Sequence, residues 1–398
     1  MKLLRAALLV CAFVVQGYFT FSKFAPSDFA AYYYGAVVIH ELLPEELYTA
    51  NWSLSQVASR GLTIGSPYLY PPFFAVLLSP VLPLFDFHSA SLLWWSVNEL
   101  ILAFLILLLI RNDSMASWLI TALLVSAPVI SVIQFGNIDL FLAVMVFFLF
   151  FPPNGVRLGD GASGVIAGLL TAVKPTYATL ILYFAIRRQW RSLTLSLITV
   201  GITVLIPLVI IGPRAFGEFL GATEIFGKGN AGVINQSLNA TISRLLTDAP
   251  YYSPADIQPP AAFPLSALAA SILLVVTFYT LWKRKMDEHH GLCLVFLMTL
   301  LASPITWFAQ CVVLIPIVFY IFRRWALTWP TLLGTACIFS WLYLINPFPQ
   351  LTLPGRLWAS HGTWGLLFLA GAVLAQKEGA GRDEQQMGGK VKNEKAES

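Results

Sequence analysis

The sequence predicts an all-α polytopic membrane protein, and three observations lead to that prediction. Of 398 residues, 58% are apolar and 11% are charged, and the charged share is roughly half that of a soluble domain. Aromatic residues make up 14%, and many lie near the ends of apolar runs, as in a membrane-interface belt. A soluble fold could not hide so much apolar surface, because much of any folded surface faces water.

Apolar runs close to the length of about 20 residues that crosses a bilayer recur along the chain, which indicates about ten to twelve crossings. Backbone polar groups in lipid must be satisfied within the segment, so each run is expected to be helical. The expected spans are 4–21, 69–85, 89–110, 116–134, 138–151, 165–186, 193–211, 264–282, 291–307, 309–322, 327–345 and 362–376.

The distribution of Lys and Arg predicts the orientation of these spans, since basic residues favour cytoplasmic loops. Basic clusters occur at Lys2 and Arg5, at 187–191, 283–285 and 323–325, and from Lys377 onward. With all five inside, both termini are cytoplasmic and three loops face outward, namely 22–68, 212–263 and 346–361. Residues 1–376 then form the transmembrane domain and 377–398 a disordered tail. The first run could also be a signal peptide, but no small-x-small cleavage site follows it.

Composition argues against a nucleic-acid partner and against a structural role for the cysteines. The net charge of +4 comes from short clusters that do not alternate with exposed aromatics, so we expect membrane lipid and no nucleic acid as a partner. The four cysteines have unrelated spacings, which gives neither a disulfide framework nor a metal site.

The first outer loop contains the most conspicuous acid. Pro26-Ser27-Asp28 is a helix-start signal, and the helix that follows is expected to be amphipathic and to lie along the outer leaflet. Asp28 shares a helix face with Tyr32. Two interpretations remain open: Asp28 is a helix cap, or it is a functional carboxylate at the membrane boundary.

Polar residues inside apolar runs are costly and therefore informative. Lys174, with Pro175 behind it, has three interpretations: a snorkelling residue, a partner of Glu99 or Asp139, or a phosphate ligand. Asp139 follows Gly136 and is expected to be a helix cap.

Amides and one arginine gather in the loop 212–263. Asn235, Gln236, Ser237 and Asn239 suit a hydroxyl-rich ligand, and Arg244 suits phosphate. The segment 302–310 offers Trp307 and Gln310 on the same side.

Six landmarks in this order resemble glycosyltransferase family 87, whose members are polytopic enzymes of the GT-C class. They include the mannosyltransferases that elongate bacterial phosphatidylinositol mannosides. The resemblance covers about residues 25–320, and its landmarks read SDFAAYYYGAVV, YLYPPFFAVLLSP, QFGNIDLFLAVMV, GLLTAVKPT, NQSLNATISRLL and SPITW.

The resemblance implies a GT-C-like helical bundle in a bacterial cell membrane and a hexosyltransferase activity. The enzyme would move a hexose such as mannose from a polyprenyl-phosphate donor to a lipid-linked or glycan acceptor, on the outer face and with inversion. Asp28 would be the general base. Lys174 and Arg244 would steady the leaving phosphate, and the other substrate-binding candidates are Tyr32, Tyr33, Tyr70, Asn235, Gln236, Trp307 and Gln310. No cofactor is expected, and a requirement for a divalent metal stays open.

Two departures and two alternatives accompany this assignment. Relatives usually carry an acid and histidines after the SPISW landmark, where this chain has Phe308, Ala309 and Gln310. They also carry an uncharged polar residue at the position of Asp139. A transporter or flippase of lipid-linked sugars would explain the spans and Lys174, but it predicts inverted repeats that the sequence does not have. A polymerase or ligase of lipid-linked glycans would share an outer-face site.

Overall fold

The computed structural model describes residues 2–48, 68–112, 117–152, 161–228, 230–247, 261–284, 286–325 and 327–376. Within them the regular structure is helical, and β-pairing is limited to an isolated bridge between Asn235 and Trp307. The predicted all-α class is confirmed. The predicted cytoplasmic tail lies outside the described residues.

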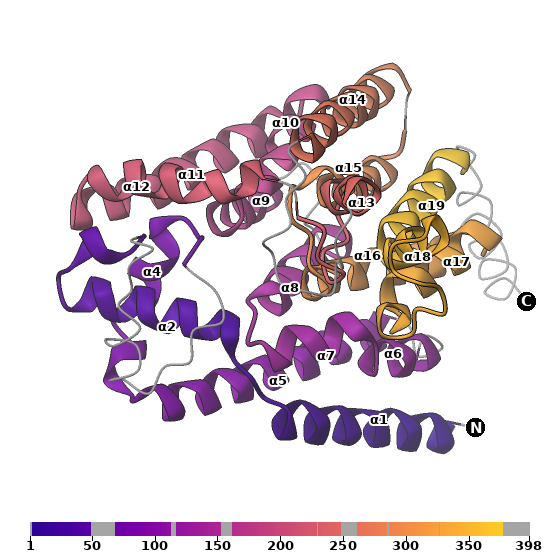
Figure 1. The fold of residues 1–398 in the computed structure, drawn as a ribbon, viewed down its shortest axis with the longest axis horizontal. Coiled ribbons are helices and arrows are strands. Elements are labelled where there is room, and N and C mark those ends of the chain that lie inside the picture. Colours follow the sequence, from indigo (N-terminus) through magenta and orange to yellow (C-terminus); the bar gives the residue numbers. More distant parts are fainter. Residues whose placement is uncertain are drawn as a thin grey trace, which may run out of the picture.

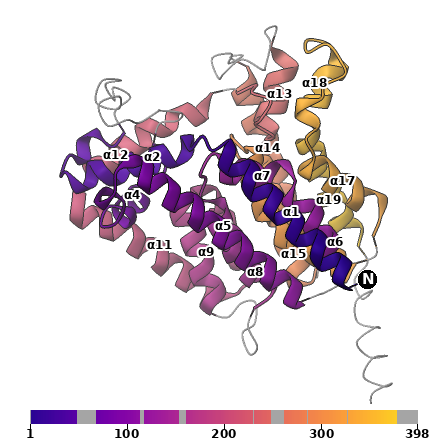
Figure 2. The same cartoon turned by 90° about the horizontal axis from the view of Figure 1, so that it is seen from below.

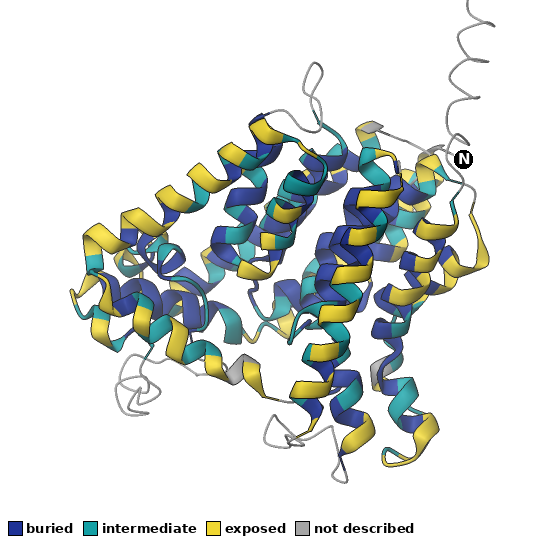
Figure 3. Ribbon diagram, turned by 90° about the horizontal axis from the view of Figure 1, so that it is seen from above, coloured by how far each residue is buried: buried dark blue, intermediate teal, exposed yellow. Residues whose placement is uncertain are grey.

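Four helices are long and apolar enough to cross a membrane: α1 (Lys2–Ser22), α5 (Phe87–Asn112), α11 (Trp190–Ile211) and α14 (Ala262–Lys283). Large apolar side chains such as Val209 on α11 and Val275 on α14 are exposed. Figure 3 shows that exposed residues follow the outward faces of the helices. Such a surface is stable against lipid rather than water, which fits a polytopic membrane protein.

Two further apolar segments are bent. The pair α6 (Ser117–Leu124) and α7 (Ala127–Gln134) bends by 51°, and the pair α18 (Leu353–Ala359) and α19 (His361–Ala375) by 65°. Counting each pair as one span gives up to six membrane-crossing helices in the described part of the chain. Pro128 at the start of α7 has no N–H for the preceding turn, which explains the first bend.

The remaining expected spans are shorter or interrupted. The segment 165–186 divides at Lys174 into α9 (Gly161–Val173), η4 (Pro175–Tyr177) and α10 (Ala178–Ile186). The other short elements are α8 (Asp139–Phe150), α15 (Glu288–Ala302), η6 (Phe308–Leu314), α16 (Ile315–Arg324), α17 (Trp329–Phe339) and η7 (Leu342–Leu344).

The predicted span 69–85 is wrong. It contains only α4 (Pro72–Leu78) and η2 (Leu82–Leu84), and a seven-residue helix rises about 10 Å, one third of the bilayer core. Pro80 and Pro83 prevent the helix from continuing.

Helix α2 (Ser27–His40) begins where the sequence predicted a helix, and η1 (Pro44–Glu46) follows it. The predicted position of α2 on the surface is wrong, because every residue from Phe29 to Ile39 is buried. The helix has apolar residues on all sides and packs against α4, α5 and η2. The catalytic candidate Asp28 therefore starts a helix enclosed by protein.

Helix α8 lies in the middle of the molecule, with η6 and α16 packed against it (Figure 1). Helices α9 and α11 approach closely at Gly164, where an added Cβ would lie 2.3 Å from the Ser192 carbonyl oxygen. Small residues permit such close contacts between membrane helices.

Helix α1 runs along one edge of the bundle, beside α6 and α7 (Figure 1). Polar contacts join it to α5: Gln16 Nε2 and Thr20 Oγ1 donate to Glu99 Oε1 at 3.0 and 2.9 Å. The buried carboxylate thus receives two hydrogen bonds from the first helix.

Segments from two of the predicted outer loops gather at one end of the molecule. Figure 2 shows α12 (Arg214–Ala222), α13 (Leu238–Leu246) and α18 at the end opposite the N-terminus. Residues 49–67 of the first outer loop and 248–260 of the second lie outside the described residues.

Candidate functional site

The turn between α7 and α8 positions the start of α2. Gly136 has φ +68°, and an added Cβ would lie 2.8 Å from Phe29 Cβ, so only glycine fits without displacing α2. The Asp28 N–H donates to the Phe135 carbonyl at 3.0 Å, and Ala25 N–H to that of Gln134 at 3.0 Å. The first turn of α2 is therefore docked on the end of α7.

The Asp28 carboxylate contacts Asn137 rather than its own helix. Asn137 Nδ2 donates to Asp28 Oδ2 at 2.7 Å, and Asn137 Oδ1 accepts from the Asp139 N–H at 3.0 Å. The second bond fixes the amide so that its NH₂ group faces Asp28. The cap interpretation of Asp28 is wrong, because α2 has no side-chain cap.

Asp139 and Lys174 form a buried ion pair. Lys174 Nζ lies 2.6 and 2.8 Å from the two carboxylate oxygens of Asp139, whose side chain has 0% exposure. Lys174 is extended at the break between α9 and η4, as expected of a residue before proline. Of the three interpretations of Lys174, the pairing with Asp139 is confirmed. The prediction that Asp139 is a helix cap is wrong, because α8 has no side-chain cap.

Two of the predicted tyrosines join this group. Tyr32 Oη donates to Tyr70 Oη at 2.8 Å, and Lys174 Nζ lies 6.0 Å from the Tyr70 ring centroid. The hydroxyl of Tyr33 donates instead to the Phe85 carbonyl at 2.8 Å, on another side of α2. We call Asp28, Asn137, Asp139, Lys174, Tyr32 and Tyr70 the charged cluster.

Burial and the neighbouring residues of the charged cluster shift the pKa of Asp28. Burial raises the pKa of Asp28 above its usual value, the Asn137 hydrogen bond and the Lys174 ammonium lower it, and the Asp139 carboxylate raises it. The net direction is upward. Burial also raises the pKa of Tyr32 and of Tyr70 well above 10, so both stay neutral at physiological pH.

A second group of buried polar residues consists of Arg244, Asn235 and Gln236, and we call it the amide cluster. The Arg244 side chain has 0% exposure. Its Nη1 donates to the carbonyls of Gly232 and Asn235 at 2.9 Å each, and its Nε donates to Ser360 Oγ at 3.0 Å. The guanidinium binds the loop's own backbone, so this geometry gives no support to the predicted phosphate contact.

Asn235 and Gln236 are also fully buried and bonded to protein. Asn235 Oδ1 accepts from the N–H groups of Ser237 and Thr306 at 3.1 and 2.9 Å. Gln236 Nε2 donates to the carbonyls of Val233 and Ala359 at 2.6 and 2.9 Å, and its Oε1 accepts from Gly362 N–H. Asn235 thus joins the loop to the segment after α15, and Gln236 joins it to α18 and α19. The geometry gives no support to their predicted contact with a sugar.

Trp307 and Gln310 are partly exposed. Trp307 forms the bridge with Asn235, and Gln310 lies in η6, which packs against α7 and α8. Phe308, at the position where relatives were expected to carry polar residues, is buried, and its ring centroid lies 5.3 Å from that of His361.

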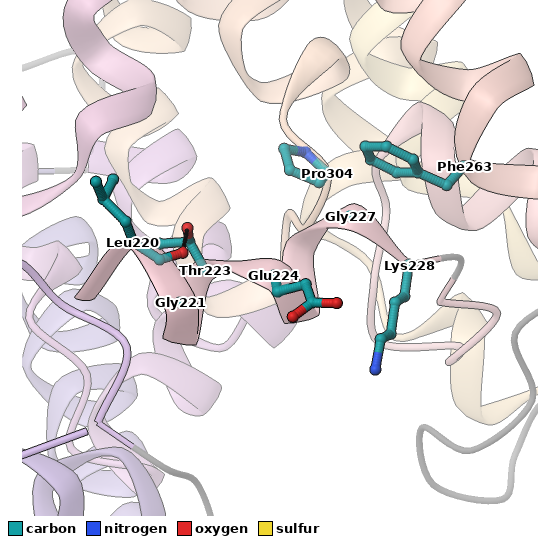
Figure 4. A pocket seen from close by; sticks show the side chains of 8 residues that line it. All are labelled: Leu220, Gly221, Thr223, Glu224, Gly227, Lys228, Phe263 and Pro304. Atoms are coloured by element: carbon teal, nitrogen blue, oxygen red, sulfur yellow. Dashed lines mark hydrogen bonds between the residues drawn. The ribbon is translucent and has the colours of Figure 1, made fainter. Parts of the chain in front are cut away.

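A groove of about 640 Å³ opens beside the amide cluster. In Figure 4, Pro304 and Phe263 lie along one edge of it and Glu224 and Lys228 along the other. These residues form no sequence motif that would have indicated a site. Among the described residues no His, Cys, Asp and Glu group could hold a metal ion.

Fold and site define a polytopic helical membrane protein with a buried carboxylate beside a lysine–aspartate pair at a helix break. The chain belongs to glycosyltransferase family 87, whose model matches residues 68–304. This match includes Asn137, Asp139 and Lys174, and Asp28 precedes it. The protein is accordingly a membrane glycosyltransferase.

Two curated proteins are similar over most of the chain. One, from Mycobacterium tuberculosis (strain CDC 1551 / Oshkosh), is 27% identical over 397 residues, covering 93% of this chain and 86% of its own. The other, from Mycolicibacterium smegmatis (strain ATCC 700084 / mc(2)155), is 26% identical over 302 residues, covering 73% and 68%. Both are named polyprenol-phosphate-mannose-dependent alpha-(1-2)-phosphatidylinositol pentamannoside mannosyltransferase. No solved structure matches significantly.

Proposed function

We propose that this enzyme transfers a hexose, mannose in the first instance, from a polyprenyl-phosphate donor to a lipid-linked acceptor on the outer face of the membrane, with inversion. The names of both relatives support the donor and a phosphatidylinositol-derived acceptor. The observation that carries the mechanism is the Asp28 carboxylate held by Asn137 within range of the Lys174 ammonium.

Asp28 is the general base in this proposal. An acceptor hydroxyl that attacks the anomeric carbon loses its proton to the carboxylate as the new C–O bond forms and the bond to the phosphate oxygen breaks. Attack on the face opposite the phosphate inverts the anomeric centre. The upward pKa of Asp28 suits a base, because a stronger base accepts the proton more readily.

Lys174 is the cation for the leaving group. Polyprenyl phosphate leaves as an anion that needs charge stabilisation rather than a proton. In the absence of substrate Asp139 balances the buried ammonium, and a bound donor phosphate would share it. Tyr70 and Tyr32 supply neutral hydroxyls at the same place, and Asn137 orients the base.

The test is transfer by purified protein in liposomes, with labelled polyprenyl-phosphate mannose and a phosphatidylinositol mannoside fraction as acceptor. Wild type is expected to label the lipid, and a folded Asp28→Asn variant is not. The anomeric configuration of the product, determined by NMR, reports inversion or retention. Donor that crosses the bilayer intact without labelling any lipid would support the flippase alternative instead.

A further inference from the structure

The groove near the amide cluster is built from three separate segments of the chain. It is lined by the end of α12, by η5 (Thr223–Gly227) with Lys228, by the start of α14, and by Pro304. Its volume of about 640 Å³ lies within the usual range for ligand sites, about 300–1,000 Å³. Its lining includes Glu224, Lys228, Thr223 and Phe263, which carry a carboxylate, an ammonium, a hydroxyl and an aromatic ring.

One buried amide holds these segments together. Asn239 Nδ2 donates to the carbonyls of Lys228 and Pro304, both at 3.1 Å. Its Oδ1 lies 3.2 Å from Ser266 Oγ on α14, one turn after Phe263. Because Asn239 is 3% exposed, these contacts fix the walls before any ligand arrives, and such preorganisation lowers the entropic cost of binding.

The groove also connects to the charged cluster. Leu220 lines it, and the ring of the preceding residue, Phe219, lies 5.7 Å from that of Tyr48. Tyr48 Oη in turn donates to the Tyr70 carbonyl at 2.6 Å. These contacts link one wall of the groove to Tyr70 of the charged cluster through two packed side chains.

We propose that this groove binds the hydroxyl-rich headgroup of the acceptor lipid, an inference that rests on the proposed function. Glu224 accepts hydrogen bonds from sugar or inositol hydroxyls, Lys228 donates to hydroxyl or phosphodiester oxygens, and Phe263 packs against the C–H face of a ring. The donor's phosphate has the Lys174 ammonium available in the charged cluster. The open groove thus serves the acceptor, and the buried cluster serves the donor.

The experiment compares steady-state kinetics of Glu224→Gln and Lys228→Ala with those of wild type, varying acceptor and donor separately. Loss of one or two headgroup hydrogen bonds is expected to raise the KM for acceptor about fivefold or more, with kcat and donor KM little changed. Arg214→Ala is the matched control, since it removes an exposed cation of α12 that does not line the groove.

A direct binding measurement separates failure of this inference from failure of the proposed function. Native mass spectrometry with dioctanoyl phosphatidylinositol is expected to show weaker binding to Lys228→Ala than to wild type or Arg214→Ala, whether or not sugar transfer occurs. Equal acceptor KM and equal binding in all proteins would overturn the inference. A rise in donor KM alone would overturn it too, because the groove would then hold the donor.

Discussion

The charged cluster and the amide cluster are both rich in buried polar groups, yet they differ in what those groups contact. In the amide cluster, Arg244, Asn235 and Gln236 bind mainly backbone carbonyl and N–H groups of the irregular loop and of α18 and α19. In the charged cluster, Asp28 and Lys174 contact side chains, whose groups a substrate can replace or share. Side chains that donate to buried backbone carbonyls stabilise the fold, because an unpaired buried carbonyl is costly. Contacts between side chains can instead be exchanged for contacts with a substrate, so such side chains can take part in catalysis.

Removing the base should have the largest effect on activity. Asp28→Asn keeps the size of the side chain but cannot accept the proton, so kcat is expected to fall about 10²–10⁴-fold, the usual worth of general-base catalysis. Sugar transfer per folded protein measures the loss, with thermal unfolding in detergent as the folding control. Near-wild-type turnover in Asp28→Asn would assign the base to another residue.

The ion pair should respond differently to single and double substitution. Lys174→Met leaves the Asp139 charge buried without a partner, which is expected to cost about 3–5 kcal/mol of stability and to abolish transfer. Lys174→Met combined with Asp139→Leu removes both charges and should recover most of the stability while staying inactive. Thermal midpoints and transfer rates are measured side by side. An active double variant would show that the pair is structural only.

Arg244→Met, in the amide cluster, should reduce stability and leave the activity of the folded protein unchanged. The carbonyls of Gly232 and Asn235 lose a charged donor, and each such bond is worth about 1.5–3 kcal/mol. The unfolding midpoint is expected to drop, whereas kcat and both KM values of the molecules that remain folded stay near wild type. If Arg244→Met is stable but has lost its affinity for the donor, Arg244 belongs with Lys174 as a phosphate ligand.

Asn137→Leu should produce the smallest and most specific change. Its hydrogen bond lowers the pKa of Asp28, so its loss raises that pKa further. A base is active when deprotonated, and activity therefore falls as pH drops through the pKa. The acid limb of kcat is expected to move toward higher pH.

Tyr33→Phe provides the control for that pH profile, because its hydroxyl donates to the Phe85 carbonyl on another side of α2. Its acid limb should coincide with that of the wild type. An unshifted limb in Asn137→Leu would remove Asn137 from the set of residues that orient the base.

Much of the charged cluster could be predicted from sequence, since a lysine before proline inside an apolar run is unusual and the resemblance to family 87 pointed to Asp28. Their partners could be suggested only as alternatives, because pairing depends on how close α2, α8 and α9 lie. The burial of α2 was not predictable: a helix with apolar residues on every side has no pattern that distinguishes a cover of protein from a lipid surface. The burial of the Asn235 and Gln236 side chains was not predictable either, because the sequence does not show which backbone groups of a loop need a side-chain hydrogen bond.

The hydrogen bonds from Gln16 and Thr20 to Glu99 have a consequence for biosynthesis. If a peptidase removed the first apolar segment after export, the Glu99 carboxylate would remain inside the bundle without these two donors, at a cost of about 1–3 kcal/mol or more. The first segment is therefore an integral helix of the folded bundle, and a chain that lost it is expected to assemble less stably.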